Sequence, residues 1–161
     1  MNCCYNVANS NIKVKFAAVE NVILIERYSS LIKLLRVTAL VRKIILIWRH
    51  KAENRNIGKR TRSHVDSKNT LSIDALDIQK AKHLWILAAQ CIVRDYKNFS
   101  QLRYQLNLLE DEFGLIRCNS RLKSSDLDNN QKYPCLLPKE HIFTKLNVLH
   151  AHFINLESTK I

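Results

Sequence analysis

The sequence predicts an α+β fold that is mainly helical, with a small antiparallel β element around residues 113–137. Two observations lead to this prediction. Apolar residues recur at alternating steps of three and four through much of the chain, the spacing that places them on one face of a helix. Turn-forming residues gather from Gly114 onward and include Asn119, Ser120 and Pro134. The predicted helices lie around residues 29–48, 72–95, 100–110 and 144–154.

The first predicted helix, residues 29–48, combines an apolar stripe with a basic face. The stripe, which we expect to be buried along its whole length, consists of Leu34, Val37, Val41, Ile44 and Trp48. Lys33, Arg36 and Lys43 share another face of the helix. Such a face either follows a phosphate backbone or simply meets water, and the sequence leaves both readings open.

The second predicted helix, residues 72–95, opens at Ser72, which can cap its first turn. Asp74 and Asp77 lie near the positive end of its dipole, where carboxylates are stabilising. His83 falls off the apolar face, and we expect it to be exposed to solvent. The apolar face consists of Ile73, Leu76, Ala81, Leu84, Trp85, Ala88 and Ile92.

A hairpin and two shorter helices complete the fold prediction. We expect a hairpin in "LIRCNSRL", residues 115–122, with its tight turn at Asn119 and Ser120, and an added edge strand at "CLL", residues 135–137. The third helix would place Leu102, Leu106 and Leu109 on one side, and the last would point Leu146, Leu149 and Phe153 inward.

Charge and composition divide the chain into three parts. Residues 1–70 carry 14 Lys and Arg against 4 Asp and Glu, whereas residues 71–161 carry 12 against 10. We expect an N-terminal extended segment and basic helix over 1–48, a basic linker over 49–70 and a helical region over 71–161. The basic half favours a polyanion such as nucleic acid, with Lys59, Arg60 and Arg62 of the linker as further phosphate contacts.

The cysteines and the apolar run bear on where the chain resides. Five cysteines, an odd number without CxxC spacing and without a preceding signal segment, predict reduced thiols in an intracellular protein of the nucleus or cytoplasm, not a secreted one. The most apolar run, "VTALVRKIILIW" at 37–48, contains Arg42 and Lys43 and falls short of the ~20 residues that a bilayer requires. No membrane partner is therefore expected.

Catalytic motifs are missing from the sequence. Two glycines cannot form a glycine-rich nucleotide loop, and neither GxSxG nor HExxH occurs. Glu110, Asp111 and Glu112 are adjacent carboxylates, which are typical of a solvated turn and only rarely hold Mg²⁺, because a hard cation needs oxygens from several segments. We therefore expect no enzymatic activity.

Four blocks occur in a fixed order: "RYSSLIKLLRVTALV" (27–41), "LSIDALDIQKAKHLWILAAQ" (71–90), "DEFGLIRCNSRL" (111–122) and "YPCLLPKEHIFTKLNVLHAH" (133–152). Together they resemble the polyprotein of BEL/Pao long-terminal-repeat retrotransposons. The matching region lies between the reverse transcriptase and ribonuclease H part and the integrase core, and it enters the integrase's N-terminal zinc-binding domain. The resemblance covers about residues 20–161.

The resemblance implies a truncated zinc module at the end of residues 71–161. In that family, zinc is held by two histidines and by two cysteines of a downstream CxxC. His152 stands at the first histidine position, Glu157 stands where the second histidine would be, and the CxxC is missing. His150 stands where the family more often has an acidic residue. Zinc is thus the cofactor of the intact family domain, and we expect none to bind to this chain.

Three hypotheses for function stay open. The first is a non-catalytic fragment of a retrotransposon polyprotein, resembling the region that supports DNA integration but lacking the integrase's catalytic carboxylates. Its partners would be DNA and other parts of the polyprotein. The second is a stand-alone basic nucleic-acid-binding module derived from such an element. The third is a protein-interaction module that uses the stripe from Leu34 to Trp48, and the oligomeric state is left open.

Overall fold

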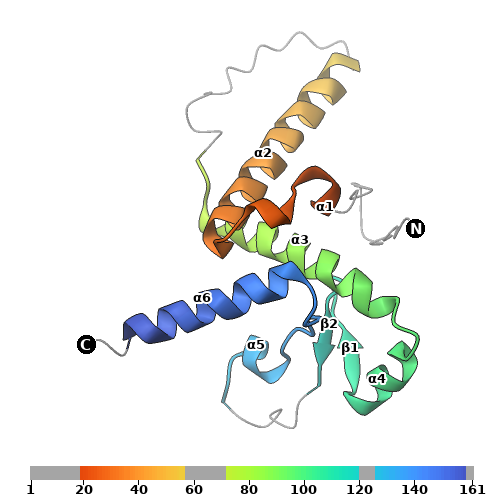
Figure 1. The fold of residues 1–161 in the computed structure, drawn as a ribbon. Coiled ribbons are helices and arrows are strands. Elements are labelled where there is room, and N and C mark those ends of the chain that lie inside the picture. The colour runs from red at the N-terminus through yellow and green to blue at the C-terminus, as the bar shows by residue number, and fades with distance from the viewer. Residues whose placement is uncertain (1–18, 57–71, 120–125, 159–161) are drawn as a thin grey trace.

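The computed structural model describes residues 19–56, 72–119 and 126–158 (Figure 1). Helices dominate, and one two-stranded antiparallel sheet accompanies them, so the prediction of a mainly helical α+β fold is confirmed. The elements in chain order are α1 (Val19–Val22), η1 (Ile25–Arg27), α2 (Leu31–Asn56), α3 (Ala75–Arg94), α4 (Phe99–Gln105), β1 (Leu108–Glu110), β2 (Ile116–Cys118), α5 (Asn129–Lys132) and α6 (Ile142–Ser158).

The three long helices α2, α3 and α6 share one core. Leu34 of α2, Trp85 of α3 and Phe143 of α6 are fully buried. The rings of Trp85 and Phe143 stack with their centroids 6.1 Å apart, which holds α3 against α6. Ile23 and Ile25 from α1 and η1 close the same core from the N-terminal side.

Two buried hydrogen bonds in series join α2 to α3 inside this core. The Trp85 indole N–H donates to Thr38 Oγ1 at 2.9 Å, and that hydroxyl donates to the Leu34 carbonyl at 2.8 Å. Thr38 is 1% exposed. The indole N–H, the Thr38 hydroxyl and the Leu34 carbonyl therefore all have partners, which offsets the free-energy cost of burying them.

Thr38→Val is expected to lower the free energy of unfolding by about 2 kcal/mol, because it leaves the buried indole N–H without an acceptor. Thr144 provides a matched control, since its hydroxyl oxygen is buried and has no hydrogen-bond partner among the described residues. Thr144→Val should be neutral or stabilising. Urea unfolding followed by tryptophan fluorescence measures both, and equal losses in the two variants would contradict the assignment.

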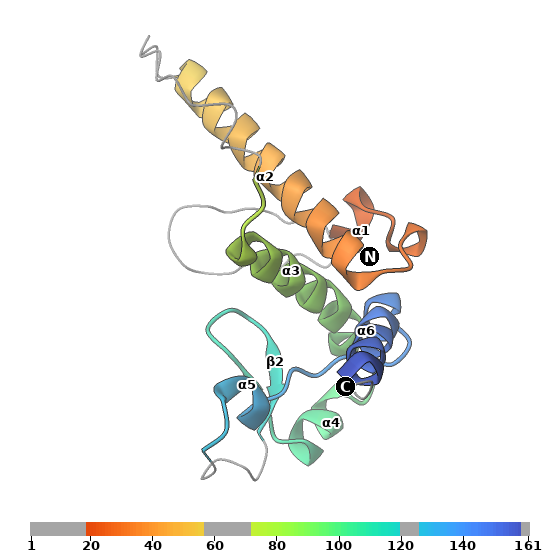
Figure 2. The same ribbon diagram turned by 90° about the vertical axis from the view of Figure 1, so that its left-hand side faces the viewer.

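Helix α2 is longer than predicted, and its apolar stripe is only partly buried. Its N-terminal half packs in the core through Leu31, Leu34, Leu35 and Ala39, but Trp48 is 68% exposed. Figures 1 and 2 show that the C-terminal half of α2 projects beyond α1 and α3. The expectation of a stripe buried along its whole length is wrong, because the helices that cover α2 end before α2 does.

Helix α3 begins at Ala75, three residues later than the predicted start at Ser72. Asp74 and Asp77 form a reciprocal capping box, in which the Asp74 N–H donates to Asp77 Oδ2 at 3.2 Å. This pair satisfies donors that would otherwise be orphaned at the helix start, so it fixes the boundary.

The apolar face of α3 is confirmed in part. Ala81, Trp85 and Ala88 are buried as predicted, whereas Leu76 and Ile92, near the two ends of the helix, are exposed. His83 was expected to be exposed, but it is half-buried against Phe113 in an edge-to-face contact with the ring centroids 5.9 Å apart. Burial lowers the pKa of His83.

Two predictions about the segment after α4 are wrong. Helix α4 ends at Gln105 instead of continuing to residue 110, because Asn107 adopts a left-handed conformation (φ 47°) that stops the helix. The hairpin consists of β1 and β2, with Leu109 opposite Arg117. Its turn therefore lies at residues 111–115, where Gly114 has a φ of 79°. The turn had been expected at Asn119 and Ser120, and Ser120 lies outside the described residues.

The predicted edge segment near residues 135–137 does extend the small sheet. Arg117 pairs with Cys135 in an antiparallel bridge. The Cys118 N–H donates to the Pro134 carbonyl at 2.9 Å, and the Leu136 N–H donates to the Ile116 carbonyl at 3.0 Å. Strand β2 is therefore hydrogen-bonded on both sides.

Gln90 attaches this sheet to α3. Its Nε2 donates to the carbonyls of Ile116 and Leu136, at 2.8 and 2.9 Å, and its Oε1 accepts from the Ile116 N–H at 2.8 Å. The side chain is 1% exposed. One amide thus pairs with three backbone groups from two segments, as a neighbouring strand would.

Helix α6 buries less of its predicted face than expected. Leu146 is buried as predicted, but Leu149 and Phe153 are exposed, which corrects the prediction that all three point inward. The core contacts of α6 come mainly from its first turns, which carry Phe143 and Leu146. Figure 1 shows the reason, because the C-terminal end of α6 extends beyond α2, α3 and the sheet.

Candidate nucleic-acid interface and metal ligands

Helix α2 carries all the predicted nucleic-acid contacts that the structure describes. Lys33 and Arg36 lie one turn apart near its start, and both are exposed. Lys43 lies two turns further along and is half-buried. Lys59, Arg60 and Arg62 lie outside the described residues.

Lys43 makes contacts within the fold. Its ammonium group donates to Asp77 Oδ2 at 2.9 Å and to the Ser72 carbonyl, which ties α2 to the start of α3. Arg42 lies 3.9 Å from the other oxygen of the same carboxylate. The hydrogen bond from Lys43 lowers the pKa of Asp77, which keeps it ionised. One carboxylate thus offsets part of the positive charge in the middle of α2.

Three cations of the predicted linker, Arg49, Lys51 and Arg55, are instead part of α2. The linker was expected to begin at residue 49, but the helix continues to Asn56 and presents Arg49 and Lys51 as exposed side chains next to the exposed Trp48. Arg, Lys, Ala and Glu are good helix formers, and "RHKAE" at residues 49–53 could have indicated this continuation. An exposed indole beside cations is the combination that stacks on unpaired bases.

The two histidines of α6 do not converge. His150 is half-buried and His152 is exposed. Residues two positions apart on a helix point to nearly opposite sides, so one ion cannot be held by both. Glu157 lies in α6, but its side chain lies outside the described part of the structure. Among the described side chains, no group of three His, Cys, Asp or Glu residues could hold a metal ion.

The acidic triplet at residues 110–112 is largely engaged by arginines. Arg94 binds Glu110 at 2.8 Å, and Arg117 Nε donates to Asp111 Oδ2 at 2.6 Å. Asp111 Oδ1 also accepts from the backbone N–H groups of Phe113 and Leu115. Burial alone would raise the pKa of Asp111, but the bond from Arg117 and the two backbone bonds outweigh burial and lower it. Glu110 is thus tied to α3, and Asp111 stabilises the hairpin turn.

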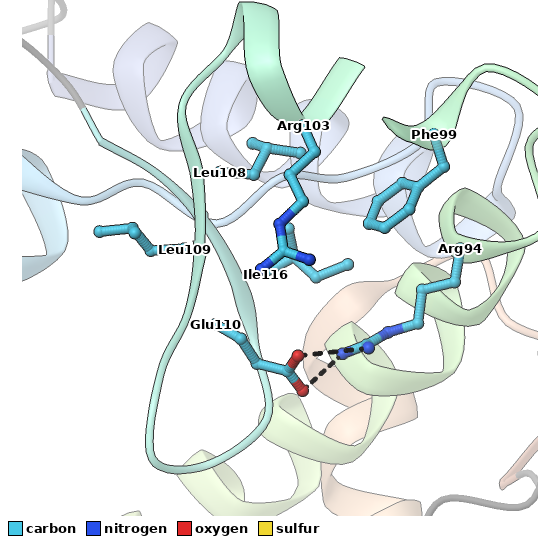
Figure 3. Close-up of a pocket in the computed structure, with 7 residues that line it drawn as sticks. All are labelled: Arg94, Phe99, Arg103, Leu108, Leu109, Glu110 and Ile116. Carbon is cyan, nitrogen blue, oxygen red and sulfur yellow. Dashed lines mark hydrogen bonds and ion pairs between the residues drawn. The ribbon is translucent and has the colours of Figure 1, made fainter. Parts of the chain in front are cut away.

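A small hollow lies beside the triplet (Figure 3). It measures about 40 Å³, which accommodates a few water molecules and no larger ligand. Arg103 points into it, while Arg94 pairs with Glu110 at its edge. The lining residues are Arg94, Phe99, Arg103, Leu108, Leu109, Glu110 and Ile116. The hollow is therefore too small to be a substrate pocket.

The described cysteines Cys91, Cys118 and Cys135 are not joined in disulfides. Burial raises the pKa of Cys118 and of Cys135. A raised pKa keeps a thiol protonated, and the protonated form is neither a good nucleophile nor a metal ligand.

A hydrogen bond between His141 and Glu20 fixes the entry into the histidine-bearing helix α6. His141, which is 7% exposed, lies with Nε2 2.6 Å from Glu20 Oε1 of α1. Its Nδ1 accepts from the Phe143 N–H at 3.0 Å, so the ring proton resides on Nε2 and is donated to Glu20. This hydrogen bond lowers the pKa of Glu20 despite the opposing effect of burial.

Glu20→Gln should destabilise the protein at neutral pH by about 1 kcal/mol, because a charge-assisted bond becomes a neutral one at a partly exposed site. The folded-state pKa of Glu20 is lower than its ordinary value of 4.5. Its contribution is therefore present above pH 4.5 and is lost as the pH falls through the lowered pKa. Urea unfolding at pH values above and below 4.5 measures the difference in the free energy of unfolding between wild type and variant.

The difference in the free energy of unfolding between wild type and Glu20→Gln is expected to shrink as the pH falls. A difference that grows would contradict the hydrogen bond between Glu20 and His141. Glu26→Gln serves as the control, since Glu26 is exposed and lies nearby in η1. The free energy of unfolding of Glu26→Gln should stay close to that of wild type at every pH.

Comparison with models of protein families, with curated proteins and with solved structures finds no match to this chain. None of the helices that the structure describes is long and apolar enough to cross a bilayer.

Proposed function

We propose that this chain is a non-catalytic segment of a BEL/Pao retrotransposon polyprotein, which supports DNA integration by contacting the DNA backbone through α2. The observation that carries the proposal is the presence of exposed cations in two groups on one uninterrupted helix, Lys33 with Arg36 and Arg49 with Lys51. The order of the four resembling blocks supports the origin, since they fall in turn on α2, α3, the hairpin and the segment leading into α6. The proposal includes no bound zinc.

The spacing of the two groups suits a duplex. Lys33 and Lys51 lie five helical turns apart, so they share one face of α2 and are separated by about 27 Å along the axis, at a rise of about 1.5 Å per residue. One turn of B-DNA measures about 34 Å, so both groups can reach phosphates of the same binding site. Contacts of this kind carry no base-specific information, and we therefore expect binding that depends little on sequence and strongly on salt.

Replacing Lys33 and Arg36 together by Glu should weaken DNA binding and flatten its dependence on salt. The slope of log K against log salt should fall by about 1.8, or about 0.9 for each lost phosphate contact. Fluorescence anisotropy with a labelled duplex at several salt concentrations measures both quantities. A wild-type chain that fails to bind even at low salt would exclude this function.

A control variant separates a specific interface from net charge. Lys97 and Lys139 are exposed and lie away from α2, so replacing both by Glu changes the net charge by the same amount. This variant should retain most of the wild-type salt slope. Equal losses in both double variants would show that only overall charge matters, and α2 would then not be the interface.

The origin is tested separately by genomic sequencing of the flanking DNA. A polyprotein segment predicts reverse transcriptase and ribonuclease H coding upstream, or downstream coding for a CxxC followed by three spaced carboxylates. Flanks with neither would contradict the polyprotein origin. A stand-alone basic module would then remain, provided that the salt-dependent binding is observed.

A further inference from the structure

The C-terminal half of α6 carries an exposed apolar seam, which consists of Leu149, Phe153 and Leu156. Their side chains are 62%, 60% and 64% exposed. The steps of four and three that join them continue from Leu146, which is buried in the core. This repeat averages 3.5 residues, the spacing that aligns side chains where two helices pack side by side. The seam thus begins in the core and runs out into solvent.

The seam differs in charge from the other exposed apolar region. Residues 146–156 contain no Lys, Arg, Asp or Glu, in a chain whose formal net charge is +12. The exposed end of α2 around Trp48, in contrast, is accompanied by Arg49 and Lys51. Two copies that approached each other through α2 would bring like charges together, whereas an approach through α6 adds no charge repulsion at the contact itself.

We propose that the seam is a self-association surface, on which α6 of a second copy of this chain packs in the antiparallel direction. A two-fold axis near Phe153 places each Leu149 opposite the partner's Leu156. Antiparallel packing sets the positive end of each helix dipole beside the negative end of the other. It also leaves the two strongly basic bodies at opposite ends of the pair, because each α6 extends outward from its own core (Figure 1).

The length of the seam limits the strength of this association. Eleven residues rise about 16 Å, and a pair of such segments buries less than the ~1,200 Å² of a stable interface. We therefore expect a reversible dimer with a dissociation constant of about 10–100 μM.

Sedimentation velocity of the full chain over about 1–200 μM tests the proposal, since this range brackets the expected dissociation constant. Wild type should shift from monomer to dimer across the range. Leu149→Asp should shift the dissociation constant upward at least about tenfold, because a carboxylate would be buried without a partner. Leu109→Asp is the matched control, since Leu109 is also exposed but lies on β1, and it should dimerise as wild type does. Circular dichroism verifies that both variants are folded.

Each other outcome would overturn the proposal. A wild-type chain that stays monomeric at the highest concentration has no such surface. Wild-type species larger than a dimer would indicate open-ended aggregation in place of a closed two-fold pair. Loss of dimer in both variants, or in neither, would place the contact elsewhere on the molecule. If Leu149→Asp has lost its helical signal, Phe153→Asp replaces it as the seam variant, and the same criteria apply to it.

Discussion

The hydrogen bonds of Gln90 are the constraint on which much of this fold depends. The sheet has only three short segments and cannot be stable on its own, since an isolated hairpin is marginal in water. By pairing with Ile116 and Leu136, Gln90 fastens the strands to a long helix that is itself anchored by Trp85. The chain then runs from Leu136 directly to His141 and Phe143. Gln90 thereby positions the segment that leads into α6, and Phe143 and His141 then hold α6 on the core through Trp85 and Glu20.

Sequence periodicity predicted the helices well, but it could not predict how far along each helix the apolar face is buried by neighbouring helices. The stripe from Leu34 to Trp48 and the face from Leu146 to Phe153 both have correct helical spacing, and each is buried only near its first turns. Spacing reports which residues share a face, whereas burial depends on the length and direction of the neighbouring helices. Residues 49–53 of α2 are exposed and carry no apolar periodicity, so the sequence predicts a linker there although the helix continues to Asn56.

Contacts between distant residues were the other part that the sequence did not reveal. Gln90, Thr38 and His141 are polar residues in apolar surroundings, and nothing in their local sequence indicates that partners lie 26 to 121 positions away. Asn107 is different, because Asn is one of the few residues that tolerate a left-handed conformation. It could have indicated the end of α4 and hence the correct turn of the hairpin. Among the candidate site residues, Lys43 had the right position on α2, but its ion pair with Asp77 required the folded chain.

The projecting half of α2 has a thermodynamic consequence of its own. Where a helix has little tertiary cover, its order rests mainly on intrinsic propensity, and such segments fray at a free energy close to zero. Arg49 and Lys51 add positive charge to this half of an already basic chain, and the self-repulsion of that charge opposes the ordered state. Any anion that neutralises these charges therefore shifts the equilibrium toward helix. Part of the binding free energy is then used to order the segment. The affinity for an anion therefore depends on how stable this end of α2 is as a helix.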